Sequence, residues 1–378
     1  MKKIKIMHII DDMNDGGAQR IILNYLRDLK NDEDVEIKLF VYGFKNNSYV
    51  NRIIEKEHLN VCYLNTKNTK INIPYFRKFF NQQIAYHVWY KAIKEYQPDI
   101  IHVHISPLLF NCLNAISKYD ALIRFDTLHS HPSRFKGIEL RYIKRAFQKE
   151  KFIPICVTNE QAQLAKKYYG FNKYEVVYNG IDIENIKSKI VSKENARNLY
   201  NISLNTFVII GVGRLDKIKR FDLLIDIFKK ILEKKENSIL IIAGNGREKS
   251  NLINKAKSLN ILDKVRFIGN QDNIIPLYCA SDVLVITSKS ESASLVLLEG
   301  QVCNLRCVIS SGVPSESIVT KNVKKMNTNA TIDDWSTSIL DCNYVGKKIN
   351  DLSSYDVHDI SKKMKGIYLK YWREYNNE

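Results

Sequence analysis

Long hydrophobic runs are missing from this sequence. Although 45% of its 378 residues are hydrophobic, no stretch approaches the roughly 18 apolar residues that a membrane-spanning helix needs. The basic start, MKKIKIMHIIDDMN, contains an apolar run that is too short for the core of a signal peptide. We therefore expect a cytoplasmic location, with the protein either free in solution or peripheral on the inner face of the cell membrane.

Cysteine is scarce and odd in number. The sequence has seven cysteines, which does not suit a closed set of disulfides. Four of them lie in or beside apolar runs, namely Cys112, Cys156, Cys279 and Cys303. Reduced thiols in a cytosolic compartment explain this pattern better than a disulfide framework does. Cys303 and Cys307 have no second pair or neighbouring histidine that would complete a zinc site, so we interpret them as buried or helix-terminal thiols.

Acidic residues are outnumbered. The 58 Lys and Arg against 41 Asp and Glu leave a formal charge of +17. Such a charge favours anionic partners, which include nucleic acid, phosphorylated small molecules and acidic membranes. The charge alone selects none of these, and a Lys-, Ile- and Asn-rich composition also follows from an AT-rich coding sequence. Because no known nucleic-acid-binding module is present, we expect no nucleic acid partner.

Short apolar runs alternate with longer amphipathic segments along most of the chain. This alternation is typical of βαβ units, and so of a parallel sheet covered by helices. A first series of strands is expected at residues 4–10, 35–42, 100–104, 121–127 and 153–158. A second series is expected at residues 207–212, 238–243, 264–268, 283–286 and 306–310. We therefore predict two α/β domains, at residues 1–183 and 184–355, followed by a helix at 356–378.

The strongest candidate site follows the strand expected at 283–286. A small-residue turn and an opening helix place free backbone N–H groups where a phosphate can bind. Glu291 is expected in this turn and Glu299 about two turns along the helix, so both could face one ligand. The alternative is that Glu291 only favours the helix dipole and that Glu299 is a solvated helix residue.

Two glycine-containing loops are also candidates. Arg214 and Lys219 flank the loop after Gly211-Val212-Gly213, where two fixed cations could clamp a diphosphate. The third glycine of a dinucleotide fingerprint is absent there, and a solvated basic loop is the alternative. Gly16 and Gly17 lie between the first strand and first helix, where backbone could approach a ligand closely; taken alone, this motif is better explained by a plain tight turn.

Taken together, these segments resemble the retaining glycosyltransferases of family 4, which have the GT-B fold. The resemblance runs in order through Gly16-Gly17-Ala18, Pro98-Asp99-Ile100-Ile101-His102-Val103-His104, Val176-Val177-Tyr178-Asn179-Gly180, Gly213-Arg214-Leu215 with Lys219, Ala243-Gly244-Asn245-Gly246, Ala280-Ser281-Asp282 and the Glu291–Glu299 pair. It implies two Rossmann-like domains facing a central cleft, with the last helix crossing back to the first domain.

The resemblance also assigns roles to residues. The second domain would bind a nucleotide-sugar, with a UDP-sugar favoured and a GDP-sugar possible as the donor. Diphosphate binding would fall to Arg214, Lys219, Gly16, Gly17 and the backbone N–H groups of Ser294, Leu295 and Val296. Glu299 would bind the ribose and Glu291 the donor sugar. His129 would lie near the reacting sugar, with His131 as the alternative histidine.

We expect no metal and no other cofactor. Fixed cations and helix N-termini can stabilise the departing nucleoside diphosphate without a metal ion. GT-A enzymes instead place a divalent ion on an Asp-x-Asp motif after a strand. The strict motif of this kind here, Asp32-Glu33-Asp34, lies in a polar loop before a strand.

The acceptor is expected to be a glycan or a polyprenyl-linked glycan of a bacterial surface polysaccharide. The sequence from Ser294 to Glu299 is similar to that of capsular and exopolysaccharide members of the family. Ser292-Ala293 departs from the usual Gly-Phe or Gly-Leu, which leaves the sugar open. Basic residues mix with aromatic ones in segments 74–96 and 134–151, which suits an anionic membrane surface; core aromatics beneath a solvated basic face are the alternative.

Two other functions fit the same sequence. A nucleotide-sugar epimerase on a GT-B-like fold would use the same donor site. A non-catalytic partner subunit of a glycosyltransferase is the second, and the altered Ser292-Ala293 keeps it open. Retention of Glu291, Glu299, Arg214 and Lys219 argues against it.

Overall fold

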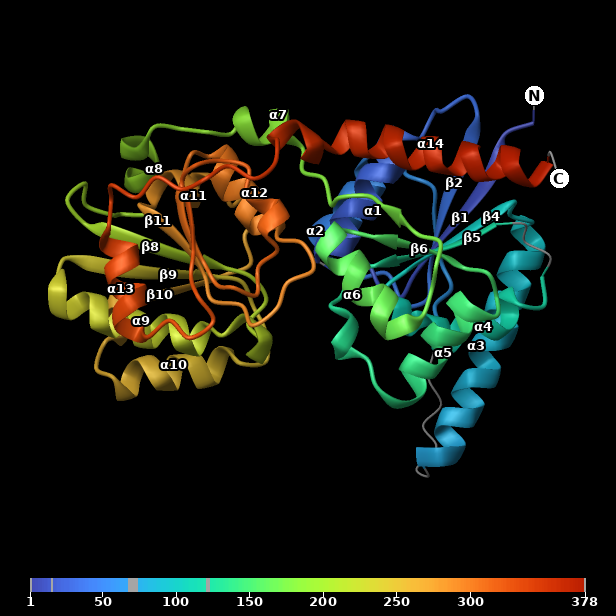
Figure 1. Ribbon diagram of the computed structural model, residues 1–378, viewed down its shortest axis with the longest axis horizontal. Coiled ribbons are helices and arrows are strands. Elements are labelled where there is room, and N and C mark those ends of the chain that lie inside the picture. Colours follow the sequence, from blue (N-terminus) through green and yellow to red (C-terminus); the bar gives the residue numbers. More distant parts are fainter. Residues whose placement is uncertain (1, 15, 67–73, 120–122, 377–378) are drawn as a thin grey trace. The chain divides into compact units, whose positions relative to one another are not determined.

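The computed structural model describes residues 2–14, 16–66, 74–119 and 123–376, with the backbone alone at 74–79. The chain divides into two compact units (Figure 1). Unit 1 comprises Met1–Gly180 and Val357–Glu378, and unit 2 comprises Ile181–Asp356. The chain therefore leaves unit 1 after Gly180 and returns to it at Val357, close to the boundaries placed at 183 and 356 from the sequence.

The described residues of unit 1 form a seven-stranded sheet in the order β3-β2-β1-β4-β5-β6-β7. Neighbouring strands pair in parallel throughout. The strands are β1 (Ile4–Ile10), β2 (Val35–Val41), β3 (Val61–Tyr63), β4 (Ile100–His104), β5 (Ile123–Leu128), β6 (Ile153–Cys156) and β7 (Glu175–Val176). Their apolar runs fit a sheet that is buried on both faces.

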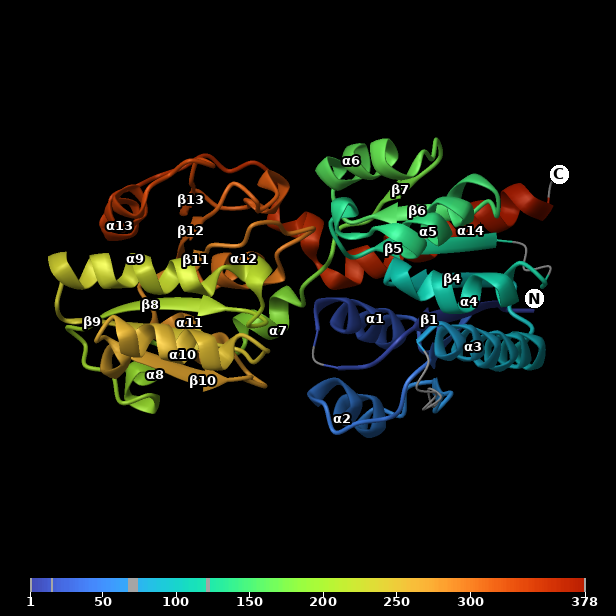
Figure 2. The same cartoon turned by 90° about the horizontal axis from the view of Figure 1, so that it is seen from below.

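Helices cover both faces of this sheet. They are α1 (Gly17–Asp28), α2 (Tyr49–Lys56), α3 (Pro74–Tyr96), α4 (Leu109–Ile116), α5 (Gly137–Gln148), α6 (Asn159–Tyr169) and α14 (Val357–Asn376). Figure 2 shows α3 and α4 side by side, and α4 also contacts α5. The C-terminal helix α14 lies against α1, as a helix returning to the first domain requires.

Each face of the unit 1 sheet has its own chemistry because strand side chains alternate. Met7, Ile9, Ile101 and Val103 belong to an apolar cluster that includes Trp89 of α3 and residues of α4. The alternate residues on the same strands include His8, His102 and His104, all fully buried. The ring of Tyr368 in α14 contacts two of these imidazoles, so polar side chains line the face beneath α14.

The described residues of unit 2 form a six-stranded parallel sheet in the order β10-β9-β8-β11-β12-β13. The strands are β8 (Phe207–Val212), β9 (Ser238–Ala243), β10 (Val265–Gly269), β11 (Val283–Ile286), β12 (Arg306–Ile309) and β13 (Val323–Lys325). The helices are α7 (Ile183–Lys187), α8 (Lys193–Leu199), α9 (Phe221–Lys234), α10 (Lys249–Ser258), α11 (Ile275–Ala280), α12 (Leu295–Val302) and α13 (Ile332–Leu340). An apolar cluster joins α9 to β8 and β9.

The two parallel sheets confirm the predicted α/β class. Cys303 caps the end of α12 and Cys307 is buried on β12, which confirms the interpretation of both as buried or helix-terminal thiols. The charged stretch between Ile183 and Tyr200 forms two helices, α7 and α8. Ser192 begins the second because its hydroxyl accepts a hydrogen bond from the Asn195 N–H. No helix among the described residues is both long and apolar enough to span a bilayer.

Candidate active site

A short polar contact in unit 2 joins Lys219 to Glu291. Lys219 follows β8 in a short 3₁₀ turn, and Glu291 lies in the loop between β11 and α12. The Lys219 Nζ lies 2.6 Å from Glu291 Oε1, and the two side chains are 22% and 10% exposed. The Ser288 hydroxyl donates a second hydrogen bond to the same carboxylate oxygen, at 2.7 Å. The site therefore holds a nearly buried carboxylate with its charge balanced.

Backbone hydrogen bonds fix the two loops that carry this pair. The Lys289 N–H donates to the Ile218 carbonyl at 2.8 Å, and the Glu291 N–H donates to the Gly312 carbonyl at 2.9 Å. A side chain at Gly312 would place its Cβ 2.3 Å from the Lys289 carbonyl oxygen, so only glycine allows this approach. Loops that follow three neighbouring strands thus meet at the carboxyl edge of the sheet, where open α/β sheets bind ligands.

Glu299 is a buried residue of α12. Only 8% of it is exposed, and its Oε2 accepts a hydrogen bond from the Tyr278 hydroxyl of α11 at 3.0 Å. The interpretation of Glu299 as a solvated helix residue is therefore wrong. Glu291 lies outside the first turn of α12 and pairs with Lys219. Because α12 begins at Leu295, Glu299 is little more than one turn along it rather than the predicted two.

The start of α12 supplies free donors beside these carboxylates. Ser294 is the N-cap, and its hydroxyl accepts a hydrogen bond from the Leu297 N–H at 3.4 Å. The N–H groups of Leu295 and Val296 lie in the first turn, where a helix offers them no partner. Arg214 lies in the loop after β8; its side chain is 64% exposed and pairs with Asp216 at 2.8 Å.

In unit 1, the paired glycines begin α1. Gly16 is the N-cap with an extended backbone and no side-chain cap, and Gly17 is the first helical residue. Asp15, the preceding residue of the motif, lies outside the described residues. The two glycines therefore place the N-terminus of a helix at the carboxyl end of β1.

The structure distinguishes the two candidate histidines. His129 directly follows β5, and its Nε2 lies 3.2 Å from Nδ1 of the buried His104. Burial lowers the pKa of His129 to about 4, so its imidazole is neutral. His131 instead caps a 3₁₀ turn, where its Nδ1 accepts a hydrogen bond from the Ser133 N–H at 3.3 Å.

His8, His102 and His104 were not identified as candidate site residues from the sequence. Residues 100–104 were interpreted as a buried strand within the family pattern. The available signal was the His-x-His alternation, which puts His102 and His104 on one face of a strand.

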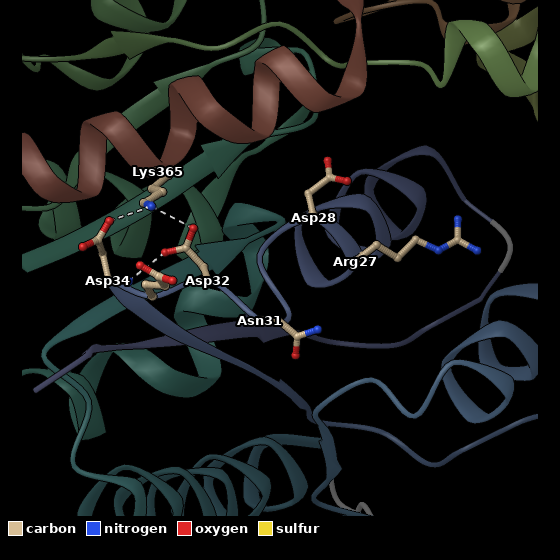
Figure 3. Close-up of a pocket in the computed structure, with 7 residues that line it drawn as sticks. Arg27, Asp28, Asn31, Asp32, Asp34 and Lys365 are labelled. Carbon is tan, nitrogen blue, oxygen red and sulfur yellow. Dashed lines mark hydrogen bonds and ion pairs between the residues drawn. The ribbon is translucent and has the colours of Figure 1, made fainter.

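The Asp-x-Asp motif has a different set of contacts. Lys365 of α14 lies 2.7 Å from Asp32 Oδ2 and 2.7 Å from Asp34 Oδ2. Figure 3 shows this lysine between the two carboxylates, with Arg27 and Asp28 of α1 lining another part of the same pocket. The motif thus pairs with the C-terminal helix within unit 1.

The aromatic residues of the basic segments divide into buried and exposed groups. Trp89 is fully buried and stacks on Tyr42, and Phe135 and Phe147 belong to the same apolar core. The core interpretation therefore holds for these three, whereas Phe80 is 45% exposed. Arg141 is exposed and Lys144 partly so. The side chains of Tyr75, Phe76, Arg77, Lys78 and Phe79 lie outside the described residues.

The chain has two parallel-sheet units, with a charge-balanced loop at the carboxyl edge of the second sheet. This arrangement is that of the GT-B class, and comparison with known sequences specifies the family. Residues 15–185 match the model of Glycosyltransferase Family 4, and residues 192–341 match that of Glycosyl transferases group 1. Together the two matches cover most of the chain. The chain belongs to this family of glycosyltransferases, as the resemblance indicated.

Curated relatives match over different lengths. The capsular polysaccharide biosynthesis glycosyltransferase CapH of Staphylococcus aureus is 23% identical over 97% of this chain and 99% of its own. The UDP-Gal:alpha-D-GlcNAc-diphosphoundecaprenol alpha-1,3-galactosyltransferase of Escherichia coli is 26% identical over 59% of this chain and 60% of its own. Two further relatives, 32% and 28% identical, align over 38% and 56% of their own length, so this chain spans only part of several relatives.

A solved structure agrees with the fold over nearly its whole length. Anabaena HepE, determined in complex with UDP-glucose, superimposes with a TM-score of 0.77 at 18% identity and covers 97% of this chain and 100% of its own. At this identity the likeness concerns the fold, and it confirms the predicted GT-B class.

Proposed function

We propose that this chain transfers a sugar from a nucleotide-sugar, with a UDP-sugar favoured, to a glycan or lipid-linked acceptor of a bacterial surface polysaccharide, with retention at the anomeric carbon. The observation that carries the proposal is the Lys219–Glu291 pair at 2.6 Å in a loop beside the start of α12. Sugar transfer needs a cation where negative charge develops on the leaving diphosphate, and an acceptor for sugar hydroxyls. Lys219 and Glu291 offer these two groups in one place.

The other residues of unit 2 would complete a donor site. Arg214 is exposed and its guanidinium can bind a phosphate in bidentate fashion. Glu299 is held by Tyr278 with its carboxylate ready to accept hydrogen bonds from ribose hydroxyls. Because these side chains supply the positive charge, we propose that no metal ion is needed. HepE, whose fold is similar, was determined in complex with UDP-glucose, which favours UDP as the nucleotide.

The first test is donor binding. UDP- and GDP-sugars are added to wild type and to Glu299→Ala, and the thermal unfolding midpoint is recorded. We expect one donor to stabilise the wild type, because a ligand that binds only the folded state raises stability with its concentration. The shift should shrink in Glu299→Ala and remain in Glu236→Ala, which removes an exposed carboxylate of the same unit.

The test compares the stabilisation by each donor in the wild type and in the variants. If no donor at millimolar concentration shifts the wild type, the donor-site proposal is wrong. Product analysis without acceptor then separates transfer from epimerisation, because an epimerase returns a changed sugar that is still attached to its nucleotide.

We propose further that unit 1 rests on an anionic membrane near a lipid-linked acceptor. The relatives include an enzyme named for a diphosphoundecaprenol acceptor, and α5 presents Arg141 and the 38% exposed Ile138. Cosedimentation with vesicles of anionic lipid should fall in Arg141→Glu/Lys144→Glu. It should not fall in Lys249→Glu/Lys257→Glu on α10 of unit 2, which makes the same change in charge. Equal vesicle binding by both variants would contradict a membrane-binding surface on α5.

A further inference from the structure

A continuous row of hydrogen-bonded side chains crosses the interior of unit 1. It begins at Thr127 on β5 and ends at His129, just beyond that strand. We call this row the histidine chain; its members are Thr127, His102, Tyr368, His8, His104 and His129. The successive contacts are Thr127 Oγ1 to His102 Nε2 (2.7 Å), His102 Nδ1 to Tyr368 Oη (2.5 Å), Tyr368 Oη to His8 Nε2 (3.2 Å), His8 Nδ1 to His104 Nε2 (2.8 Å) and His104 Nδ1 to His129 Nε2 (3.2 Å).

Each imidazole in this row is neutral. Burial lowers the pKa of His8 to about 3 and that of His129 to about 4, and it lowers the pKa values of His102 and His104 well below their usual range. A neutral imidazole has one N–H and one lone pair. A ring that accepts on one side must therefore donate on the other. The Tyr368 hydroxyl has one proton and uses it only if it accepts from one ring and donates to the other. With that proton used, the hydrogen bonds along the chain run in the same direction.

The two ends decide which direction is favoured. The Thr127 hydroxyl can either donate or accept, so that end tolerates both directions. At the other end, His129 Nδ1 is buried and has no hydrogen-bond partner among the described residues. An orphaned buried N–H is avoided more strongly than an unused lone pair. The favoured direction therefore leaves a lone pair on His129 Nδ1 and puts the proton of all four imidazoles on Nε2.

We propose that Tyr368, His8 and His104 act as positioning residues that hold the proton of His129 on Nε2 and keep its Nδ1 as a hydrogen-bond acceptor for a substrate hydroxyl. The position of His129 near the reacting sugar rests on the proposed function; the control of its proton rests on the contacts of the chain alone. Tyr368 thus links helix α14, through the chain, to His129, which precedes the helix by more than 200 residues in the sequence.

The test is to read the tautomers directly. The full chain is prepared with ring-¹⁵N histidine, and the two ring nitrogens of each histidine are observed by NMR in the wild type, Tyr368→Phe and Tyr371→Phe. Tyr371 is the matched control because it lies one turn along the same helix and its hydroxyl bonds Glu175, at 3.1 Å, outside the chain. A His129→Gln sample assigns the signals of His129.

In the wild type we expect His8, His102, His104 and His129 all to carry the proton on Nε2. In Tyr368→Phe, the N–H of the fully buried His8 loses its acceptor. Reversing the segment His8–His104–His129 would leave the bare N–H on His129 Nδ1 instead, so each direction then has one N–H without an acceptor and the wild-type preference is lost. We expect the tautomer ratio of these three to change together by about tenfold toward Nδ1–H, with no change in Tyr371→Phe.

Several results would overturn the proposal. One is a wild-type protein in which some of these four histidines carry the proton on Nδ1 and others on Nε2. Another is a folded Tyr368→Phe variant in which the tautomer ratio of His129 is unchanged. If that variant does not fold, the wild-type tautomers and ¹⁵N couplings across the His8–His104 and His104–His129 hydrogen bonds decide the question. The ring nitrogens of His8, His102 and His104 lie within 4.8 Å of one another, so stoichiometric zinc in the purified chain that is lost in His8→Asn would also overturn it.

Turnover then separates this inference from the function on which it rests. With the donor found in the binding panel, Tyr368→Phe should lower kcat by about tenfold and leave KM within about twofold, whereas Tyr371→Phe should change neither. Tautomers that shift while kcat stays constant would support the histidine chain and count against a role for His129 near the reacting sugar.

Discussion

The two units arrange polar groups at their carboxyl edges in opposite ways. All eight histidines of the chain lie in unit 1, and four of them form a buried row of neutral groups. Unit 2 has no histidine in its sequence, and its edge holds ionised groups such as Lys219 and Glu291. Neutral rings can be buried deeply because they need only hydrogen bonds, whereas the charged pair stays near the surface because burying ions is costly.

This difference suits two tasks. A diphosphate needs fixed positive charge, which the lysine of unit 2 can supply. A histidine that must present a lone pair needs neighbours that fix its tautomer, which the histidine chain of unit 1 can supply. The predictions that follow test whether charge matters in unit 2 and neutrality in unit 1.

The largest effect is expected from removing the cation of unit 2. Lys219→Ala should lower kcat by about a hundredfold to a thousandfold, as the loss of one group that stabilises developing negative charge commonly does. Steady-state turnover of the identified donor measures this. Lys217→Ala removes an exposed lysine of the same short turn and should keep wild-type turnover; equal losses in the two variants would show that overall charge, not the position of Lys219, matters.

Acid should destabilise unit 1 selectively. The four buried histidines have lowered pKa values when folded but bind protons below about pH 6.5 when unfolded. The unfolded state then binds more protons, so stability falls as the pH falls. Asp126 acts in the opposite sense, because burial raises its pKa well above the usual range and the folded state keeps a proton that the unfolded state loses.

The net effect can be estimated from these opposing contributions. Between about pH 7 and pH 5.5 the four histidines lower the stability of unit 1 and Asp126 raises it; because four groups oppose one, unit 1 should lose stability overall. Hydrogen exchange followed by mass spectrometry reports each unit separately. Asp126→Asn should increase the loss, and an equal acid sensitivity in both units would contradict the contrast drawn between them.

The smallest effect concerns the ion pairs of unit 1 itself. Lys365→Ala removes two contacts of α14 with the Asp-x-Asp loop and should lower the free energy of unfolding by about 1 kcal/mol, because partly exposed pairs contribute little. Urea unfolding measures it. The control Lys362→Ala, with a 77% exposed side chain on the same helix, should leave the urea midpoint unchanged. A loss of several kcal/mol in Lys365→Ala would mean that charge is as important in unit 1 as in unit 2.

Most of the fold could be predicted from the sequence because its strands are apolar runs. The predicted bounds of β1, β4, β8, β9 and β11 agree with the structure. The strands that sequence reasoning missed, β3, β7 and β13, have two or three residues each and lie at sheet edges. An edge strand is exposed on one side, so it needs no apolar run and leaves no such signal.

The candidate site could be predicted in part. Glu291, Glu299 and Lys219 were identified from motif spacing, but their contacts join residues as far apart as 72 positions, which local patterns do not encode. The histidine chain is still less local, since Tyr368 meets His8 across 360 positions. Strand pairing brings His8 beside His102 and His104 beside Thr127, and the packing of α14 adds Tyr368 to them.

The return of the chain to unit 1 makes unit 2 an insertion within another domain. The chain leaves at Gly180 and re-enters at Val357, and a Cβ on Gly180 would lie 2.9 Å from the Val357 Cα. Within unit 2, Ile181 and Asp356 form a bridge. The ends of each piece are thus already adjacent, as in domains that tolerate cutting and rejoining. A short splice from residue 180 to residue 357 could therefore close unit 1 into one continuous chain, and residues 181–356 could be moved to another protein as a cassette.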